Sequence, residues 1–315
     1  MYGVNGELLS RHYKNRLSGY HRWKQLPHAD EYVLFKHNVG ESLSMDETCL
    51  SQGELYTLVT NKSAHGGKGS LVAMIQGTKS ETVIHCLNLL PRSLRLKVAE
   101  ITIDLSPSMK LIAKRAFPNA TIVSDRFHVQ KLINEAISDL RVDYRWAAID
   151  QENTEMALAK EVGHKFIPHI FSNGDTRRQL LARSRHIVMK HFSKWTQSQS
   201  QRAQILFEQY PEIKDAYDVS MELTRIYNEK STDKGRALTK LARWYEKVER
   251  LNCKFFNSVV ATMQNNYATI VNYFDNRSTN ASAESFNAKV KAFRAQFRGV
   301  RDIPFFIFRL AKIFA

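Results

Sequence analysis

Hydrophobic and polar positions alternate in short runs over one part of the chain and repeat with helical spacing over the rest. From about residue 41, apolar runs of strand length occur at 43–50, 53–61 and 70–78. The last two flank the Gly-rich segment KSAHGGKG, which predicts a hairpin turn. Two further runs, at 100–106 and 120–125, each precede a stretch with helical periodicity. The pattern therefore predicts the order β-β-β-α-β-α-β-α.

The helices in this order follow the third, fourth and fifth predicted strands. Residues 80–97 have helical spacing, 107–117 carries Pro107 near its first turn, and 127–146 is long and amphipathic. An antiparallel three-strand meander followed by parallel strands with crossover helices is the topology of the ribonuclease H-like fold. We therefore predict an α/β fold in which a ribonuclease H-like mixed sheet has flanking helices.

The spacing from about residue 150 to 270 is helical almost throughout, with breaks at SNGD, YPE and NEKSTDKG. This pattern predicts an all-α insertion that interrupts the sheet domain. We accordingly expect four parts. They are an N-terminal helical connector (1–40), the first part of the core (41–150), the all-helical insertion (151–270) and the final core helices (271–315).

The chain is strongly basic, with 46 Lys and Arg against 31 Asp and Glu, a net charge of +15 and a pI near 9.7. This excess favours nucleic acid as the partner, because each neutralised phosphate releases counterions. An anionic membrane is a weaker alternative. The three cysteines form no CxxC pair and the N-terminus has no signal-peptide core, so we expect a cytoplasmic, nucleoid-associated protein without a membrane anchor.

Four carboxylates are candidates for the chemistry. Asp46, Asp104 and Asp125 each end a short apolar run, and Glu284 stands on a later helix rich in Lys and Arg. In the predicted topology Asp46 and Asp104 end adjacent central strands, and the last helix brings Glu284 over them. Neighbouring carboxylates repel unless a cation bridges them, and hard oxygen ligands suit Mg²⁺ or Mn²⁺. Two such ions can support an in-line phosphodiester displacement.

Asp125 competes with Asp104 for the second catalytic position. Its strand lies one step further from the first strand, so we rank Asp104 as the better metal ligand. Asp125 and His128 form a D-x-x-H unit at a strand-to-helix junction, which we interpret as an accessory motif. A junction hydrogen bond that only fixes the end of the strand is an equally good interpretation.

The helix that carries Glu284 has an apolar side and a basic side. At about 100° per residue, Phe286, Val290 and Phe293 form one stripe. The neighbouring arc carries Glu284, Asn287, Lys291, Arg294 and Arg298. We predict contacts with DNA phosphates from Lys289, Lys291, Arg294 and Arg298. The ordinary alternative for Glu284 is a first-turn carboxylate that complements the helix dipole, with Asn280 or Ser282 as the cap.

Two long segments carry a family resemblance. Residues 101–132 and 272–301 closely resemble DDE transposases of bacterial insertion sequences, in the ISL-three family. The resemblance covers the chain from about residue 30 onwards. It implies a ribonuclease H-like core interrupted by a helical insertion before the catalytic Glu. By position it implies Asp46, Asp104 and Glu284 as the catalytic triad, although some descriptions of the family would choose Asp125 instead of Asp104.

The same resemblance implies partners and a reaction. Family members cut DNA at element ends and join the freed 3′-OH to target DNA, so we expect both DNAs as partners and a homo-oligomer on DNA. They usually carry an N-terminal zinc-binding and helix-turn-helix region. About forty residues precede the core here, so we expect that module to be a separate polypeptide, or to be missing or truncated.

Two other functions compete with that of a transposase. A ribonuclease H-like nuclease or resolvase would cut DNA without joining strands, and a strand-transfer assay separates it from a transposase. A domesticated or relic DNA-binding protein would keep the fold without the reaction. Its signature is DNA binding without metal-dependent cleavage.

Overall fold

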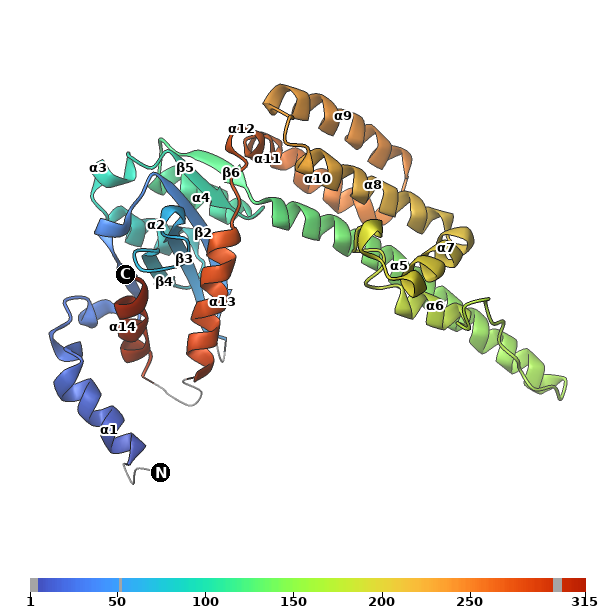
Figure 1. Cartoon of the computed structure of the whole chain (residues 1–315), viewed down its shortest axis with the longest axis horizontal. Coiled ribbons are helices and arrows are strands. Elements are labelled where there is room, and N and C mark those ends of the chain that lie inside the picture. Colours follow the sequence, from blue (N-terminus) through green and yellow to red (C-terminus); the bar gives the residue numbers. More distant parts are fainter. Residues whose placement is uncertain (1–4, 51–52, 297–301) are drawn as a thin grey trace. The chain divides into compact units, whose positions relative to one another are not determined.

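The computed structural model describes residues 5–50, 53–296 and 302–315. The chain divides into two compact units. The sheet unit comprises Met1–Asp125 and Asn276–Ala315, and the helical unit comprises Arg126–Asp275 (Figure 1). The chain therefore leaves the sheet unit once and returns to it once, as expected for an insertion.

Six strands of the described residues form one sheet in the order β1-β4-β3-β2-β5-β6. Neighbours from β1 through β2 are antiparallel, whereas β5 is parallel to β2 and β6 is parallel to β5. The predicted ribonuclease H-like fold is confirmed, with β1 as an additional edge strand. The strands are β1 (Tyr32–Leu34), β2 (Ser42–Cys49), β3 (Leu55–Asn61), β4 (Leu71–Gln76), β5 (Glu100–Ile103) and β6 (Thr121–Ser124).

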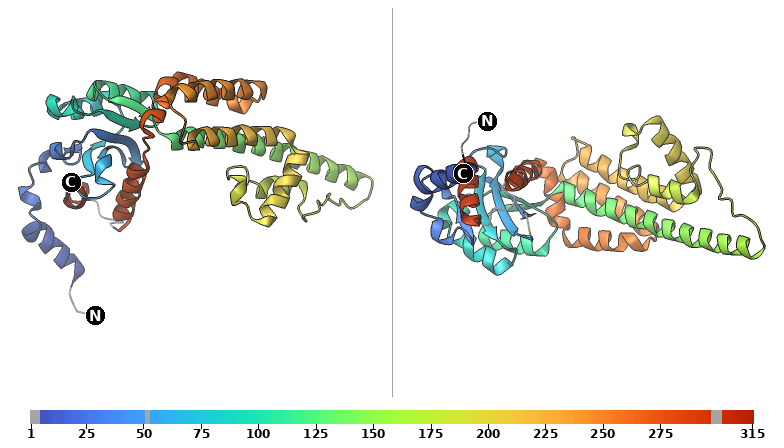
Figure 2. Two further views of the ribbon diagram at one scale, coloured as in Figure 1. Left: turned by 45° about the horizontal axis from the view of Figure 1, so that its top comes forward. Right: turned by 90° about the horizontal axis from the view of Figure 1, so that it is seen from below.

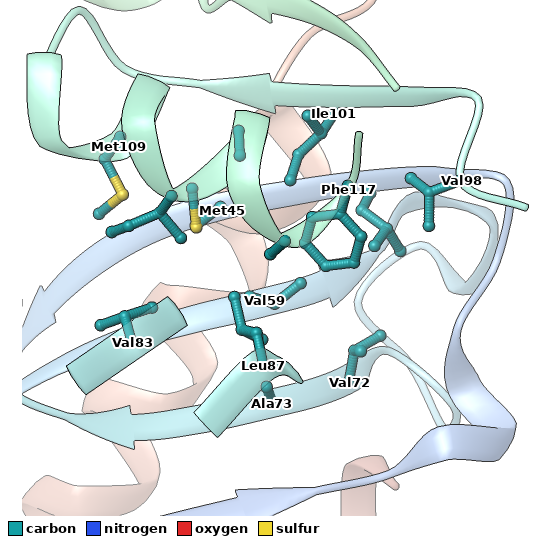
Figure 3. Packing of buried hydrophobic residues seen from close by; sticks show 14 of the residues in the cluster. Met45, Val59, Val72, Ala73, Val83, Leu87, Val98, Ile101, Met109 and Phe117 are labelled. Carbon is teal, nitrogen blue, oxygen red and sulfur yellow. The ribbon is translucent and has the colours of Figure 1, made fainter. Parts of the chain in front are cut away.

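One face of the sheet is apolar and packs against helices α2 (Ser80–Asn88) and α4 (Pro107–Ala116). Successive side chains of a strand point to opposite faces of the sheet. Every second residue of a strand therefore enters this core, among them Met45 of β2 and Ile101 of β5. Figure 3 shows both side chains in the same cluster as Met109 of α4. The short helix α3 (Arg92–Arg95) follows α2.

The opposite face packs against helices α13 (Ala281–Gln296) and α14 (Ile303–Phe314) over β3 and β4 (Figure 2). Phe286 and Val290 of α13 are fully buried there, in a cluster that includes Leu58 of β3. This confirms the apolar stripe predicted for the last core helix. Over β2, β5 and β6 the same face carries polar side chains instead, and these include the candidate carboxylates.

The helical unit starts at Arg126, because α5 is one continuous helix from Arg126 to Glu161. Its buried positions, among them Val129, Ile133 and Ile137, continue with helical spacing, so the chain offers no break near residue 150. The unit boundary therefore lies earlier than the expected residue 151. The other helices are α6 (Arg177–Arg183), α7 (Gln197–Gln209), α8 (Pro211–Asn228), α9 (Lys234–Arg250), α10 (Asn257–Asn265), α11 (Tyr267–Val271) and α12 (Tyr273–Asn276).

The N-terminal connector contains helix α1 (Gly6–His12) and short helical turns, but also the strand β1. Among the helices of the described residues, none is long and apolar enough to cross a membrane.

Candidate active site

Asp104 and Asp125 directly follow β5 and β6, as predicted, whereas Asp46 lies inside β2, paired with Leu58 of β3, and not at the end of its strand. The three aspartates are nevertheless aligned across three neighbouring strands. Ser44 of β2 pairs with Thr102 of β5, and continuing this parallel register by two residues places Asp46 beside Asp104. Ile103 pairs with Ser124 of β6, so the next residues along are Asp104 and Asp125. Adjacent strands lie about 4.8 Å apart, so the register forms a row of carboxylates at this point of the sheet.

These aspartates share the polar face of the sheet. Residues two apart on a strand point to the same side, so Asp46 follows Ser44, and Asp104 follows Thr102. Asp46 and Asp104 are half-buried, whereas Asp125 is only 1% exposed. One oxygen of Asp104 accepts the backbone N–H of Ser106 at 2.9 Å, which fixes the carboxylate at the start of α4. Asp46 and Asp104 therefore keep solvent access that Asp125 lacks.

Several negatively charged carboxylates lie close together around this row of aspartates. The pKa of Glu47 is raised, first by burial and then by the nearby charges of Asp104 and Asp46. Like charges oppose ionisation of a neighbour, so Asp104 and Asp46 add to the effect of burial on the pKa of Glu47. A cation at this position would relieve the repulsion.

Helix α13 is tied to two of the three aspartates. The backbone N–H of Asn280 donates to Asp125 Oδ1 at 3.3 Å, and Asn287 Nδ2 donates to Asp46 Oδ2 at 2.6 Å. Seven helical residues advance about 10 Å, close to two strand spacings, so one helix face can reach both. Glu284 lies four residues after Asn280 and three before Asn287, on the same face. The helix thus carries Glu284 between its two attachment points.

The donor set fits a divalent cation, although it is not yet gathered around one point. Within residues 5–50, 53–296 and 302–315, no three His, Cys, Asp or Glu side chains lie close enough together to hold a metal ion. Asn287 Oδ1 and both side-chain polar atoms of Asn280 are buried without a hydrogen-bond partner. Buried polar atoms of this kind, beside half-buried carboxylates, indicate a site that is completed by something polar.

Comparison with known proteins decides the family. A family model described as a transposase, of the DDE type and the ISL-three group, matches residues 43–310. The chain belongs to this transposase family. The match spans both the aspartate row and α13. No curated protein and no solved structure is similar enough to the chain to add a second comparison.

The basic residues that we predicted to bind DNA on α13 of this transposase differ in their surroundings. Lys291 is exposed, and Lys289 donates from Nζ to the carbonyl of Gly66 at 2.7 Å. Arg294 is buried and forms a bidentate ion pair with Glu54, with distances of 3.1 and 2.7 Å. Arg298 lies outside the described residues. Lys291 is therefore the member of this set that is most available to DNA.

The D-x-x-H unit that we interpreted as an accessory motif has one residue in each unit. Asp125 is the last residue of the sheet unit, and His128 is in the first turn of α5 in the helical unit, half-buried and edge-on to Phe127. Each residue is well placed within its own unit. Their pairing stays a prediction.

Sequence reasoning gave no role in the site to two residues that contact its framework. Asn287 stands three residues after Glu284, and this spacing placed it on the same arc of the helix without indicating its contact with Asp46. Lys62 follows β3 and is buried against Glu100 at 3.2 Å. No local pattern singles out Lys62, because its partners lie far away in the sequence.

Proposed function

We propose that the chain is the catalytic part of an insertion-sequence transposase that cleaves DNA at element ends and transfers the 3′-OH strand into target DNA. The observation that carries the proposal is the aspartate row under α13, with Glu284 placed between two attachment points of that helix. Membership of the transposase family supports DNA as the substrate.

We assign Asp46, Asp104 and Glu284 to hold Mg²⁺ or Mn²⁺, in two sites. Divalent ions bound there would activate the attacking oxygen and stabilise the leaving oxygen of an in-line displacement. Asp46 is oriented for this by Asn287 and by the backbone N–H of Glu47, which donates to Oδ1 at 2.8 Å. The protein supplies the carboxylates and their orientation, and the DNA phosphate supplies further oxygen ligands.

Asp125 has a supporting part in this proposal. It is almost fully buried and accepts a hydrogen bond from the first residue before α13, so it anchors the helix that carries Glu284. Lys291 and Lys289 would contact the phosphate backbone beside the site. We leave Arg294 out of these contacts, because its guanidinium is engaged with Glu54.

The test is cleavage and joining of DNA that carries the element's own ends. Asp46→Asn, Asp104→Asn and Glu284→Gln should each lower Mg²⁺-dependent cleavage by roughly 10²–10³-fold, the order of magnitude for removing one group that stabilises the transition state, with unchanged DNA affinity. Asp125→Asn should lose less activity than Asp104→Asn. Full activity of Asp46→Asn or Glu284→Gln would contradict the assignment, and cleavage without joining would favour a nuclease.

A further inference from the structure

A buried ion pair lies beneath the segment through which the chain returns to the sheet unit. Lys62 follows β3 and Glu100 begins β5, and Lys62 Nζ is 3.2 Å from Glu100 Oε1. Their side chains are only 13% and 7% exposed. Buried charges are costly unless they are paired and fully hydrogen-bonded, and burial lowers the pKa of Lys62 despite the Glu100 charge. Neighbouring groups must therefore supply further hydrogen bonds to both charges, to offset the cost of burying them.

The ammonium group of Lys62 has three partners. Besides Glu100 it donates to Thr102 Oγ1 at 2.6 Å and to the hydroxyl of Ser278. A lysine ammonium has three donors, so all are used. Ser278 belongs to residues 276–280, which we call the return segment. One buried charge thus connects the end of β3, the start of β5 and the return segment.

The return segment also holds the carboxylate of Glu100 from the other side. The hydroxyl of Ser278 donates to Oε1, and Asn276 Nδ2 donates to Oε2 at 3.3 Å. Arg277, between them, has a left-handed backbone with φ of 52°. That conformation is unfavourable for a residue with a Cβ by roughly 1–2 kcal/mol, and it persists where surrounding contacts impose it. Here the residues on both sides of Arg277 donate hydrogen bonds to the carboxylate of Glu100.

The return segment leads directly into the helix of the site. Asn280 is bound to Asp125, and its carbonyl accepts the N–H of Glu284 at 2.8 Å, so the helical hydrogen bonds begin two residues after Ser278. A helix is stiff along its axis, so the position of its first turn sets the position of Glu284. Whatever fixes Ser278 also fixes Glu284.

We propose that Lys62, Glu100 and Ser278 form a lock that positions Glu284 against Asp46 and Asp104, and we call these three residues the Lys62 lock. They are positioning residues, since they act through the return segment. The inference rests on the proposed function, because it gives Glu284 a task in metal binding. The inference adds that a contact outside the carboxylate row determines the position of α13.

Ser278→Ala tests the lock with little disturbance, and Thr279→Ala is its matched control. Thr279 is the next residue and is exposed, so its truncation leaves the lock intact. In the full-length protein, hydrogen exchange at the amides of residues 281–288 should be at least several-fold faster in Ser278→Ala than in the wild type or in Thr279→Ala. This measurement requires neither metal nor DNA.

The second readout is the affinity of the site for a divalent ion. With Mn²⁺ alone as the probe, followed by electron paramagnetic resonance, Ser278→Ala should bind about tenfold more weakly, the lower end of the effect of outer-shell changes at metal sites. The Mg²⁺ concentration for half-maximal DNA cleavage should rise by a similar factor. DNA affinity should not change. A residue that only supports the fold would not separate metal affinity from DNA affinity in this way.

Lys62 itself is tested with variants that differ in the charge they leave behind. Lys62→Met leaves the Glu100 carboxylate without its cationic partner. It is therefore compared with the double variant Lys62→Met/Glu100→Gln, which keeps the side-chain volumes and removes both charges. Both should show the weakened Mn²⁺ binding, because neither holds Ser278 as an ammonium does. Lys62→Arg, which keeps a charged donor, should retain part of the affinity for Mn²⁺.

The outcomes separate the inference from the proposed function. If the wild type cleaves, Asp46→Asn does not, and Ser278→Ala keeps wild-type exchange and Mn²⁺ affinity, the lock is wrong and the function stands. If the wild type and Asp46→Asn are equally inactive and bind Mn²⁺ equally, the proposed function is wrong and the lock loses its task.

Discussion

Asn287 is a single side chain that couples helix α13 to strand β2. Its amide nitrogen holds one oxygen of Asp46 at 2.6 Å, while the N–H of Glu47 holds the other. Both oxygens of Asp46 therefore have set directions before any ligand arrives. Hydrogen bonds to a charged acceptor are about twice as strong as neutral ones, so this contact also helps to seat α13 on β2.

We expect Asn287→Ala to lower the rate of DNA cleavage by roughly 10–100-fold, the usual effect of removing an outer-shell partner of a metal-binding carboxylate. Affinity for DNA should stay the same, because Asn287 is buried beneath the helix. Single-turnover cleavage and fluorescence anisotropy measure the two quantities. Ser285→Ala, an exposed change on the same helix, serves as the control. Equal rates in the two variants would remove Asn287 from the site.

At the scale of elements, one buried aspartate joins two helices of the helical unit. Asp175 has no exposed surface, and it accepts hydrogen bonds from Arg183 of α6 and from Arg202 Nε of α7, the latter at 2.6 Å. Burial by itself raises the pKa of Asp175, but the hydrogen bonds from Arg202 and Arg183 outweigh it and lower the pKa below its usual value. The charged form is thus the one that the fold stabilises.

The lowered pKa of Asp175 predicts a pH dependence of stability. A carboxyl whose folded pKa lies below the unfolded value contributes stability above the unfolded pKa, and the contribution is lost as the pH falls through the folded pKa. Urea unfolding of the full protein should therefore weaken more steeply below about pH 4 in the wild type than in Asp175→Asn. At pH 7 that variant should lose roughly 3–5 kcal/mol, because it leaves Arg202 unpaired. Parallel pH profiles of the two proteins would contradict this account.

At the scale of the whole molecule, some of the 46 Lys and Arg residues are paired with carboxylates. Arg294 is neutralised by Glu54, and Lys62 by Glu100. Lys291, in contrast, is exposed on α13, about one turn after Asn287. The number of cations that can meet a phosphate backbone is therefore smaller than the count of Lys and Arg residues.

Salt titration of DNA binding distinguishes these cations. Lys291→Ala should reduce the slope of log K against log salt by about one, the loss of one phosphate contact. Arg294→Ala should leave the slope unchanged and instead lower the free energy of unfolding by roughly 3–5 kcal/mol, because it strands Glu54 in a buried position. Anisotropy with a duplex at several salt concentrations, together with urea unfolding, measures both. A reduced slope in Arg294→Ala would show that it contacts DNA after all.

Much of the sheet was predictable because its alternation is regular. The run 43–50 became β2 at Ser42–Cys49, and α13 begins at Ala281, directly after Asn280, one of the two residues that we named as its possible cap. The strand β1 was missed, since three residues are too short to show a period. Its outward backbone groups are taken by the side chains of Gln25 and His28, contacts that periodicity does not reveal.

The sequence alone determined the order of β2 to β6 along the chain, the helical insertion and the family, because these depend on local periodicity and on long contiguous motifs. It also placed Asp104 and Asp125 at strand ends. Only the tertiary structure decided which polar groups meet: Asn287 with Asp46, Arg294 with Glu54, and Lys62 with Glu100 and Ser278. Each of these contacts joins residues far apart in the chain, and whether a charge is free or paired follows from packing that no local pattern encodes.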